Sequence, residues 1–165
     1  MLQVEPRQDL DGWSQLDERA SYTYEAMLTS EAMVTKKPGT GQTYLGAYRD
    51  AKGHTLDGSK NYHLRVPPEA PAKQFWSLTV YDLDTRTLVK NKLQRADLSS
   101  RSKGLVVNDD GSTDLWFGPE APKGKESNWI QTIPGQSWFT YLRLYAPLES
   151  YFSREWPLSD IELVK

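Results

Sequence analysis

The chain of 165 residues contains no cysteine. This absence excludes disulfides, thiolate catalysis, cysteine-ligated zinc sites and iron–sulfur clusters. It does not indicate a compartment, because a chain without cysteine is compatible with both the cytosol and the periplasm. Any chemistry of this protein must therefore use oxygen and nitrogen groups.

Histidine is nearly absent as well, with His54 and His63 as the two examples. A metal centre of the cupin type needs about three histidines and a carboxylate on facing strands, so we expect no bound metal and no cofactor. Both histidines are expected to have surface or hydrogen-bonding roles. Aspartates in turns could in principle bind calcium, but the capping of backbone N–H groups accounts for them without a metal. No Gly-x-Ser-x-Gly motif occurs, so a serine hydrolase is not expected.

Positive charge and long apolar runs are also scarce. The formal net charge is −2 and the longest cationic run is Lys36-Lys37, so we expect no nucleic-acid partner. No window approaches the roughly 18 apolar residues of a membrane span, and the first ten residues lack the apolar core of a signal peptide. We therefore expect a soluble protein with no membrane span, cytoplasmic as given. A periplasmic or cell-envelope origin stays open if the sequence is a fragment.

The strongest positive signal is strict alternation along residues 138–145, which predicts a β-strand. One side of this strand carries Trp138, Thr140, Leu142 and Leu144, and the other carries Phe139, Tyr141, Arg143 and Tyr145. Arg143 therefore lies among three aromatic rings. It is either a paired structural residue or the anchor of a ligand, and the sequence does not decide between these two roles.

The rest of the chain has the same β-rich character. Helical spacing of apolar residues predicts one amphipathic helix over about residues 14–28. Period-two patterns and turn residues predict strands at 43–48, 62–66, 75–81, 105–107, 113–117, 128–133, 138–145 and 161–164, and a short helix around Tyr151-Phe152. Turns at Asp50–Gly53 and Asn108–Gly111 predict hairpins, and Pro134-Gly135 predicts a turn between the strands on either side of it.

Many short strands without a βαβ rhythm favour a mainly β fold, an antiparallel jelly-roll-like β-sandwich with an N-terminal amphipathic helix. We expect residues 1–165 to form a single domain, with a helical lead-in over about 14–28 and the sandwich over about 43–165.

Six ordered segments carry a resemblance to a known family. They are Leu56–Tyr62, Phe75–Arg86, Asp110–Ser112, Trp116–Pro119, Asn128–Thr132 and Leu142–Tyr145. With them the chain resembles a bacterial domain-of-unknown-function family, number 1214, over about residues 14–165. The resemblance implies a helical segment followed by a jelly roll, commonly placed after another uncharacterised domain, number 1254. It implies no particular chemistry.

The candidate site residues are those that combine charge, amide or phenol groups with strand ends or outward strand positions. They are Arg143, Tyr141, Tyr145, Tyr81, Asp82, Asp84, Arg86, Tyr62, Asn128 and Trp129. Asp82 or Asp84 is expected to pair with Arg86 or Arg143, or else to cap a turn.

We expect these residues to bind a small polar ligand, a sugar or an organic acid, in a cleft lined by aromatic rings and arginine, or to dock an upstream partner domain. A homo-oligomer is a further option. The alternative is a metal-independent, carboxylate-driven hydrolase or lyase acting on a sugar or aromatic substrate.

Overall fold

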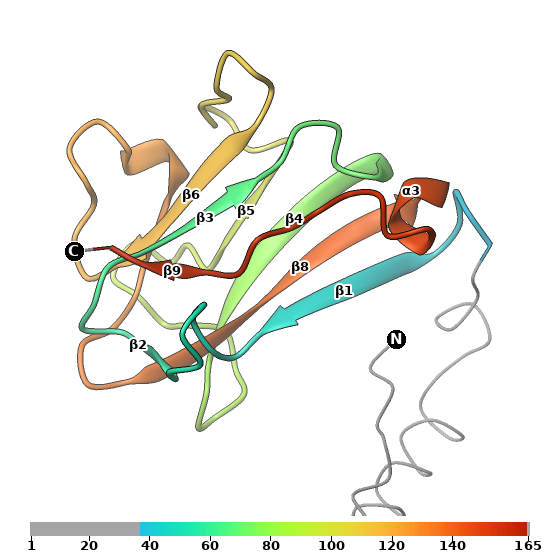
Figure 1. The fold of residues 1–165 in the computed structure, drawn as a ribbon. Helices are drawn as coiled ribbons and strands as arrows, with labels where there is room; N and C mark the ends of the chain where they lie inside the picture. Colours follow the sequence, from blue (N-terminus) through green and yellow to red (C-terminus); the bar gives the residue numbers. More distant parts are fainter. Residues whose placement is uncertain (1–36, 165) are drawn as a thin grey trace, which may run out of the picture.

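The computed structural model describes residues 37–164 and shows a mainly β protein in which nine strands form two sheets (Figure 1). The helix predicted over residues 14–28 lies outside these residues. The short helix predicted around Tyr151 is present as α3 (Glu149–Phe152), and a 3-10 helix, η1 (Glu126–Asn128), precedes β7.

The five-stranded sheet is built around β8 (Ser137–Pro147). Its order is β1 (Gln42–Ala47), β8, β4 (Ala72–Asp82) and β5 (Asp97–Ser99), and β2 (Leu56–Asp57) pairs with the first residues of β8. All of these pairs are antiparallel. The strands predicted from alternation at 43–48, 75–81 and 138–145 are thereby confirmed.

The four-stranded sheet has the order β7 (Trp129–Gln131), β6 (Thr113–Gly118), β3 (Tyr62–Val66) and β9 (Glu162–Leu163). The pair of β6 and β7 is parallel, so the prediction of a wholly antiparallel fold is wrong at this point. The turn predicted at Pro134-Gly135 is present, and it carries the chain from one sheet to the other. Ile130 and Leu142 consequently reach the core from opposite sheets.

Residues 105–107 do not form the strand predicted for them, although the following turn is present. The Gly111 N–H donates to the Asn108 carbonyl (2.8 Å) and the Asn108 N–H donates to the Ser112 carbonyl (2.8 Å). The backbone of Val106 is bonded instead by the side chain of Asn128, which accepts from its N–H (2.8 Å) and donates to its carbonyl (2.7 Å). A side-chain amide thus takes the place of a strand partner.

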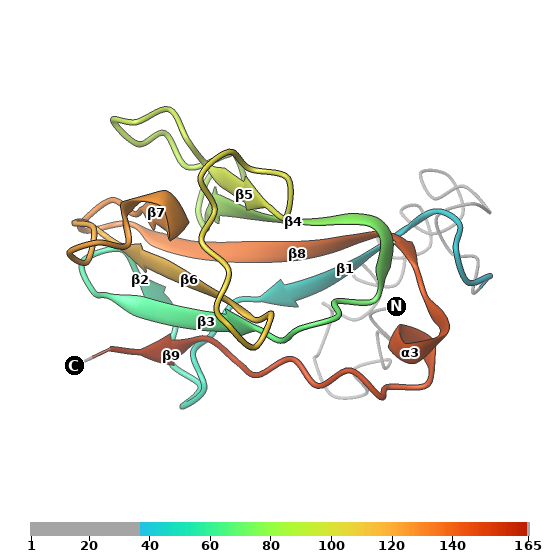
Figure 2. The ribbon, with the colours of Figure 1, turned by 90° about the horizontal axis from the view of Figure 1, so that it is seen from above.

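The core lies between the two sheets, which Figure 2 shows edge-on as two layers. Alternate side chains of β4 and β8 point into it, and β3 and β6 supply the facing layer. Its fully buried members include Tyr62, Leu78, Val80, Leu115, Phe117, Ile130, Trp138, Leu142 and Leu144. The other face of the five-stranded sheet then carries every second residue of the same strands, including Arg143.

Candidate functional site

The outward face of the five-stranded sheet is rich in aromatic rings. Antiparallel register places Phe75 opposite Tyr145, Ser77 opposite Arg143, Thr79 opposite Tyr141 and Tyr81 opposite Phe139, and on the other side of β8 it places Tyr44 opposite Arg143. We call the outward side chains Tyr44, Tyr48, Phe75, Tyr81, Phe139, Tyr141, Arg143 and Tyr145 the aromatic face. Three strands that are distant in sequence build it, because β8 lies between β1 and β4.

Arg143 lies half-buried near the middle of the aromatic face. Its guanidinium donates a hydrogen bond to the Tyr81 hydroxyl and lies 5.3 Å from the ring centre of Tyr44 and 6.0 Å from that of Tyr81. Its Nε atom is buried and makes no hydrogen bond, and none of the ion pairs within residues 37–164 includes Arg143. The side chain is therefore a cation held by rings and one phenol, with hydrogen-bonding capacity left over.

One end of the aromatic face is a stack of three rings under a second arginine. Tyr48, Phe139 and Tyr81 are stacked in order, with centroid distances of 4.8 Å and 5.1 Å. The Arg86 guanidinium lies 5.2 Å from the Phe139 ring centre and 5.8 Å from that of Tyr48. Phe139 is consequently only 3% exposed although it points away from the core.

The turn after β4 puts Arg86 in this place. The Asp82 carboxylate accepts hydrogen bonds from the Thr85 N–H (2.7 Å) and hydroxyl (2.8 Å), which lower the pKa of Asp82. Arg86 has a left-handed backbone (φ 58°), and its N–H donates to the Asp82 carbonyl (3.0 Å). The Asp82 carboxylate therefore stabilises the turn that positions Arg86 over the rings. The side chains of Asp82 and Arg86 form no ion pair with each other.

The opposite end of the face carries a third arginine. Phe75 and Tyr145 are stacked with a centroid distance of 4.1 Å, and the Arg101 guanidinium lies 4.3 Å from the Phe75 ring centre. Arg101 also donates to the Gln74 carbonyl (3.1 Å). The sequence prediction did not include Tyr44, Tyr48, Phe75 or Arg101. Residues 75 and 81 lie on the same side of a strand because they are an even number apart, but this alternation could not show that β4 and β1 flank β8.

Gly46 leaves room for the ring at the centre of the face. A Cβ atom at Gly46 would lie 2.9 Å from Cε1 of Tyr141, so the Tyr141 ring leans over this glycine. The Tyr141 hydroxyl is hydrogen-bonded to that of Tyr48 (2.5 Å). Tyr141 is thereby joined to both the stacked rings and the surroundings of Arg143.

The structure brings Arg143, Tyr141, Tyr145, Tyr81 and Arg86 together on the aromatic face. Asp82 lies next to them in the turn that carries Arg86. It does not bring the other four candidates there. Asp84 is exposed in the same turn and has no ion pair within residues 37–164, Tyr62 is 1% exposed in the core, and Asn128 and Trp129 lie on the other sheet. The Trp129 indole donates to the Gly118 carbonyl (3.0 Å).

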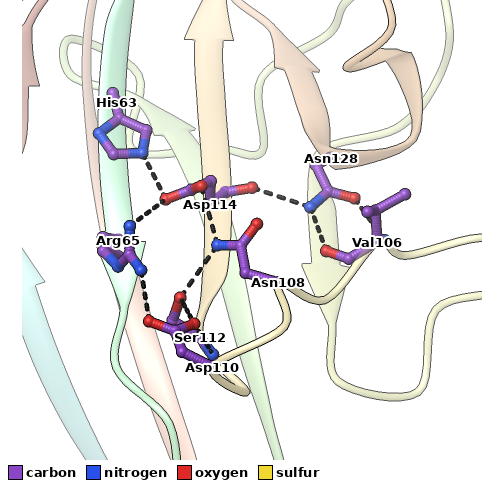
Figure 3. A network of polar contacts seen from close by, with 8 residues as sticks. All are labelled: His63, Arg65, Val106, Asn108, Asp110, Ser112, Asp114 and Asn128. Carbon is purple, nitrogen blue, oxygen red and sulfur yellow. Dashed lines mark hydrogen bonds and ion pairs between the residues drawn. The ribbon is translucent and has the colours of Figure 1, made fainter.

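A second polar cluster lies on the four-stranded sheet, with Asp114 at its centre (Figure 3). Asp114 accepts from His63 Nε2 (2.8 Å) and from Asn108 Nδ2 (2.9 Å). Burial raises the pKa of Asp114, but these two bonds together with the electrostatic attraction of His63 and Arg65 outweigh it, so the pKa is lower than usual. His63 thus has the hydrogen-bonding role expected for it.

The same cluster continues into the Asn108–Gly111 turn. Asp110 accepts from the side chain and backbone of Ser112 (2.6 Å and 3.0 Å) and forms an ion pair with Arg65 (2.6 Å). The bonds from Ser112, and then the pairing with Arg65, lower the pKa of Asp110 to about 2. These contacts tie β3, β6 and the turn to one another.

A small hollow adjoins Asp114 on the side of η1. Its walls include Asp114, Trp116, Lys125 and Asn128, and the volume open to the centre of a water molecule is about 10 Å³. The buried indole nitrogen of Trp116 has no hydrogen-bond partner within residues 37–164. The hollow is no larger than a single water molecule requires.

Within residues 37–164 no group of three or more His, Asp or Glu side chains is arranged to hold a metal ion. In the same part of the chain no helix is long and apolar enough to cross a membrane.

The fold and the aromatic face define a mainly β protein of two packed sheets with an arginine- and tyrosine-rich outer surface. Residues 41–149 match the model of the protein of unknown function family DUF1214, and the chain belongs to that family. No curated protein matches the chain.

The solved structures that are similar to the chain include the following two. The VPA0106 protein from Vibrio parahaemolyticus is 25% identical with a TM-score of 0.65, and the match covers 75% of this chain and 31% of the Vibrio chain. An uncharacterised protein from Burkholderia cenocepacia is 15% identical with a TM-score of 0.49, covering 96% of this chain and 45% of the other. The match with the Vibrio protein thus takes in less than a third of that protein's length.

Proposed function

We propose that the protein is a noncatalytic binding module whose aromatic face binds a small polar ligand bearing a carboxylate, an organic acid or a sugar acid, through Arg143. The single observation that carries this proposal is the half-buried Arg143 guanidinium, which has no carboxylate partner and a buried Nε without a hydrogen bond within residues 37–164. A buried charge is costly unless it is paired, so an incoming anion would be favoured at this place.

The surroundings of Arg143 support a ligand that is both planar and polar. A guanidinium can bind a carboxylate through two parallel N–H groups, and the rings of Tyr44 and Tyr81 lie close enough to contact the body of the ligand. Ser77 and Thr79 lie opposite Arg143 and Tyr141 on the neighbouring strand, but both are buried and leave the contact with the ligand to the rings. Such a ligand would be recognised by charge at one end and by ring contact along its side.

The test is ligand binding measured by calorimetry and by thermal unfolding, with a panel of organic acids, aromatic acids and uronic acids. Arg143→Ala should abolish a ligand-induced rise of the melting temperature, because a ligand that binds the native state stabilises it by mass action. Arg143→Lys should weaken binding, since lysine lacks the two-pronged geometry. Arg154→Gln, which removes an exposed arginine beyond α3, is the matched control. Equal binding by wild type and Arg143→Ala would refute the proposal.

Docking of a partner is the second candidate function, and the observation that favours it is the 31% coverage of the Vibrio chain. In such a complex, a carboxylate of an upstream domain or of a second copy would pair with Arg143. Sedimentation of the protein alone and mixed with a separately produced domain of family 1254 would detect either complex. In such a complex the partner's carboxylate would occupy Arg143, so no acid of the panel should raise the melting temperature of the complex.

A carboxylate-driven hydrolase or lyase is less well supported by the geometry. Such an enzyme needs a carboxyl group able to donate or accept a proton at the substrate. Asp82 is engaged by Thr85 and has a lowered pKa, which does not suit a general acid.

As to the fold, we further infer that the strands follow a jelly-roll course within a single domain.

A further inference from the structure

Three arginines lie on rings of the same sheet face. Arg101 lies over Phe75 at one end, Arg143 beside Tyr44 and Tyr81 in the middle, and Arg86 over Phe139 at the other end. None of the three forms an ion pair within residues 37–164. In a protein with a net charge of −2, this face therefore gathers three unneutralised guanidinium groups.

The composition of the face indicates which kind of polyanion it suits. The outward positions from Gln42 to Gly46, Phe75 to Tyr81, Asp97 to Ser99 and Phe139 to Tyr145 carry aromatic residues, Ser, Thr, Gly, Gln, Asp97 and Arg143, and Ala72 and Pro147 pair at one end of the sheet. The exposed Leu88 lies at the border, opposite Tyr81. Tyr, Phe and Arg are enriched at protein interfaces as well. The rings and phenol groups of this face also match the C–H faces and hydroxyls of sugars.

The face is also longer than one small ligand. Tyr145 and Phe139, which mark its two ends, are six residues apart on β8, which corresponds to about 20 Å at about 3.4 Å per residue. A single monosaccharide would reach only one of the three guanidinium groups. A chain of several sugars laid along β8 would reach all three.

We propose that the ligand of the aromatic face is an acidic oligosaccharide, a chain of uronic acid residues whose carboxylates pair with Arg101, Arg143 and Arg86 and whose pyranose rings lie on the tyrosines. This proposal rests on the proposed function of Arg143 and names its ligand class. The carboxylate of one sugar binds at Arg143, and the flanking sugars extend toward the stacked rings at each end. Asp97 is the one carboxylate among the outward residues of β4, β5 and β8, and Asp57, opposite Ser137, and Asp84, in the turn that carries Arg86, add negative charge near one end of the face.

The test measures the affinity of galacturonate and of its dimer, tetramer and hexamer by calorimetry. Affinity should rise with chain length until the oligomer is long enough for its carboxylates to reach all three arginines. Arg86→Gln and Arg101→Gln should each weaken hexamer binding by about two- to fivefold, as expected for exposed charge pairs, and should leave the monomer unaffected. Arg143→Ala should weaken both. Arg154→Gln is the control for loss of an arginine elsewhere, and thermal unfolding of each variant verifies that it is folded.

The outcomes separate the two proposals. Monomer binding that depends on Arg143, with no gain from longer chains, would overturn the oligosaccharide proposal and leave the proposed function standing. No binding of monomer or oligomer by wild type would overturn both. Equal affinity for a neutral glucan oligomer would show that charge is not recognised, and equal affinity for oligoglutamate or oligothymidylate would show a general polyanion surface. Either result would overturn the assignment to acidic sugars.

Discussion

At the residue scale, Asn128 shows how one side chain can replace backbone pairing. Its amide oxygen accepts from Val106, and its amide nitrogen donates to the carbonyls of Val106 and Asp114 (2.9 Å for the latter). Both amide protons are thereby used, which leaves little capacity for a ligand. Asn128 was a reasonable site candidate from its sequence beside Trp129, but only the three-dimensional arrangement shows how its amide is engaged.

Asp110 provides a prediction of pH dependence at the same scale. Its pKa of about 2 in the folded protein lies below the ordinary value of 3.8, so its charged form stabilises the fold. This contribution is complete above the ordinary pKa and is lost as the pH falls toward the folded value, between about pH 5 and about pH 2. The Asp110→Asn variant keeps an acceptor for Ser112 but cannot titrate. We expect its free energy of unfolding to fall less steeply over this range than that of the wild type.

The measurement is urea unfolding at a series of pH values. The neighbouring Asp109→Asn is the matched control, since Asp109 lies in the same turn and makes no hydrogen bond or ion pair within residues 37–164. Identical pH slopes for wild type and Asp110→Asn would contradict the assigned role of the Ser112 and Arg65 contacts.

At the scale of elements, the sequence predicted strands better than it predicted their partners. Alternation located β3, β4 and β8 because each buries one face, and the proline and glycine turns marked their ends. It failed at Leu105–Val107, which has a β-rich composition but bonds to the side chain of Asn128 instead of to a strand. It also failed to predict that β7 pairs with β6 in parallel. Composition gives local preference, whereas pairing depends on which edge is free once the core has formed.

The edge of β7 that does not pair with β6 illustrates this dependence on distant residues. The Trp129 carbonyl accepts from Arg95, and the Gln131 carbonyl accepts from Asn91 Nδ2 (3.0 Å). Asn91 is itself 7% exposed and also donates to the Arg95 carbonyl (2.6 Å). The loop before β5 therefore occupies an edge that would otherwise be open to another strand. No feature of residues 91–95 alone predicts this contact.

The close approach of two turns yields a prediction about Gly58. A Cβ atom at this position would lie 2.1 Å from the Ile133 carbonyl oxygen and 2.8 Å from that of Gln136. Both contacts are with backbone, so the turn after β2 would have to move away from the turn before β8. Its hydrogen bond from Gly58 N–H to the Gln136 carbonyl (2.9 Å) would be broken. We expect Gly58→Ala to destabilise the protein markedly.

Gly124→Ala is the control for this loss of stability. Gly124 has a left-handed backbone (φ 75°), but no atom lies within 4 Å of the position that a Cβ atom would take. Its cost should be the conformational one of about 1 kcal/mol, and Gly58→Ala should cost several times as much in chemical denaturation. Equal destabilisation by the two substitutions would show that the two turns can separate at little cost.

At the scale of the whole molecule, the two sheets have different outward surfaces. The four-stranded sheet carries the network around Asp114, whose charged groups largely pair with one another. The five-stranded sheet carries arginines that lie on rings without carboxylate partners in residues 37–164. The sequence indicated Arg143, Tyr141 and Tyr145 as one group because a single strand holds them. It could not add Tyr44 and Phe75, because their position depends on sheet order.

This difference between the surfaces predicts how salt affects binding and folding. If carboxylates pair with exposed guanidinium groups, the affinity for an acidic ligand should fall strongly between about 0.1 M and about 1 M salt, over which the screening length shrinks from about 10 Å to about 3 Å. The melting temperature of the free protein should change little in comparison, because the core between the sheets is apolar. Calorimetric titrations and thermal unfolding at the same series of sodium chloride concentrations measure both quantities.

Arg143→Ala should flatten the salt dependence of binding, whereas Arg154→Gln should not. An affinity that is constant across the series would mean that ring contact rather than charge holds the ligand, and the three arginines would then serve to shield the rings.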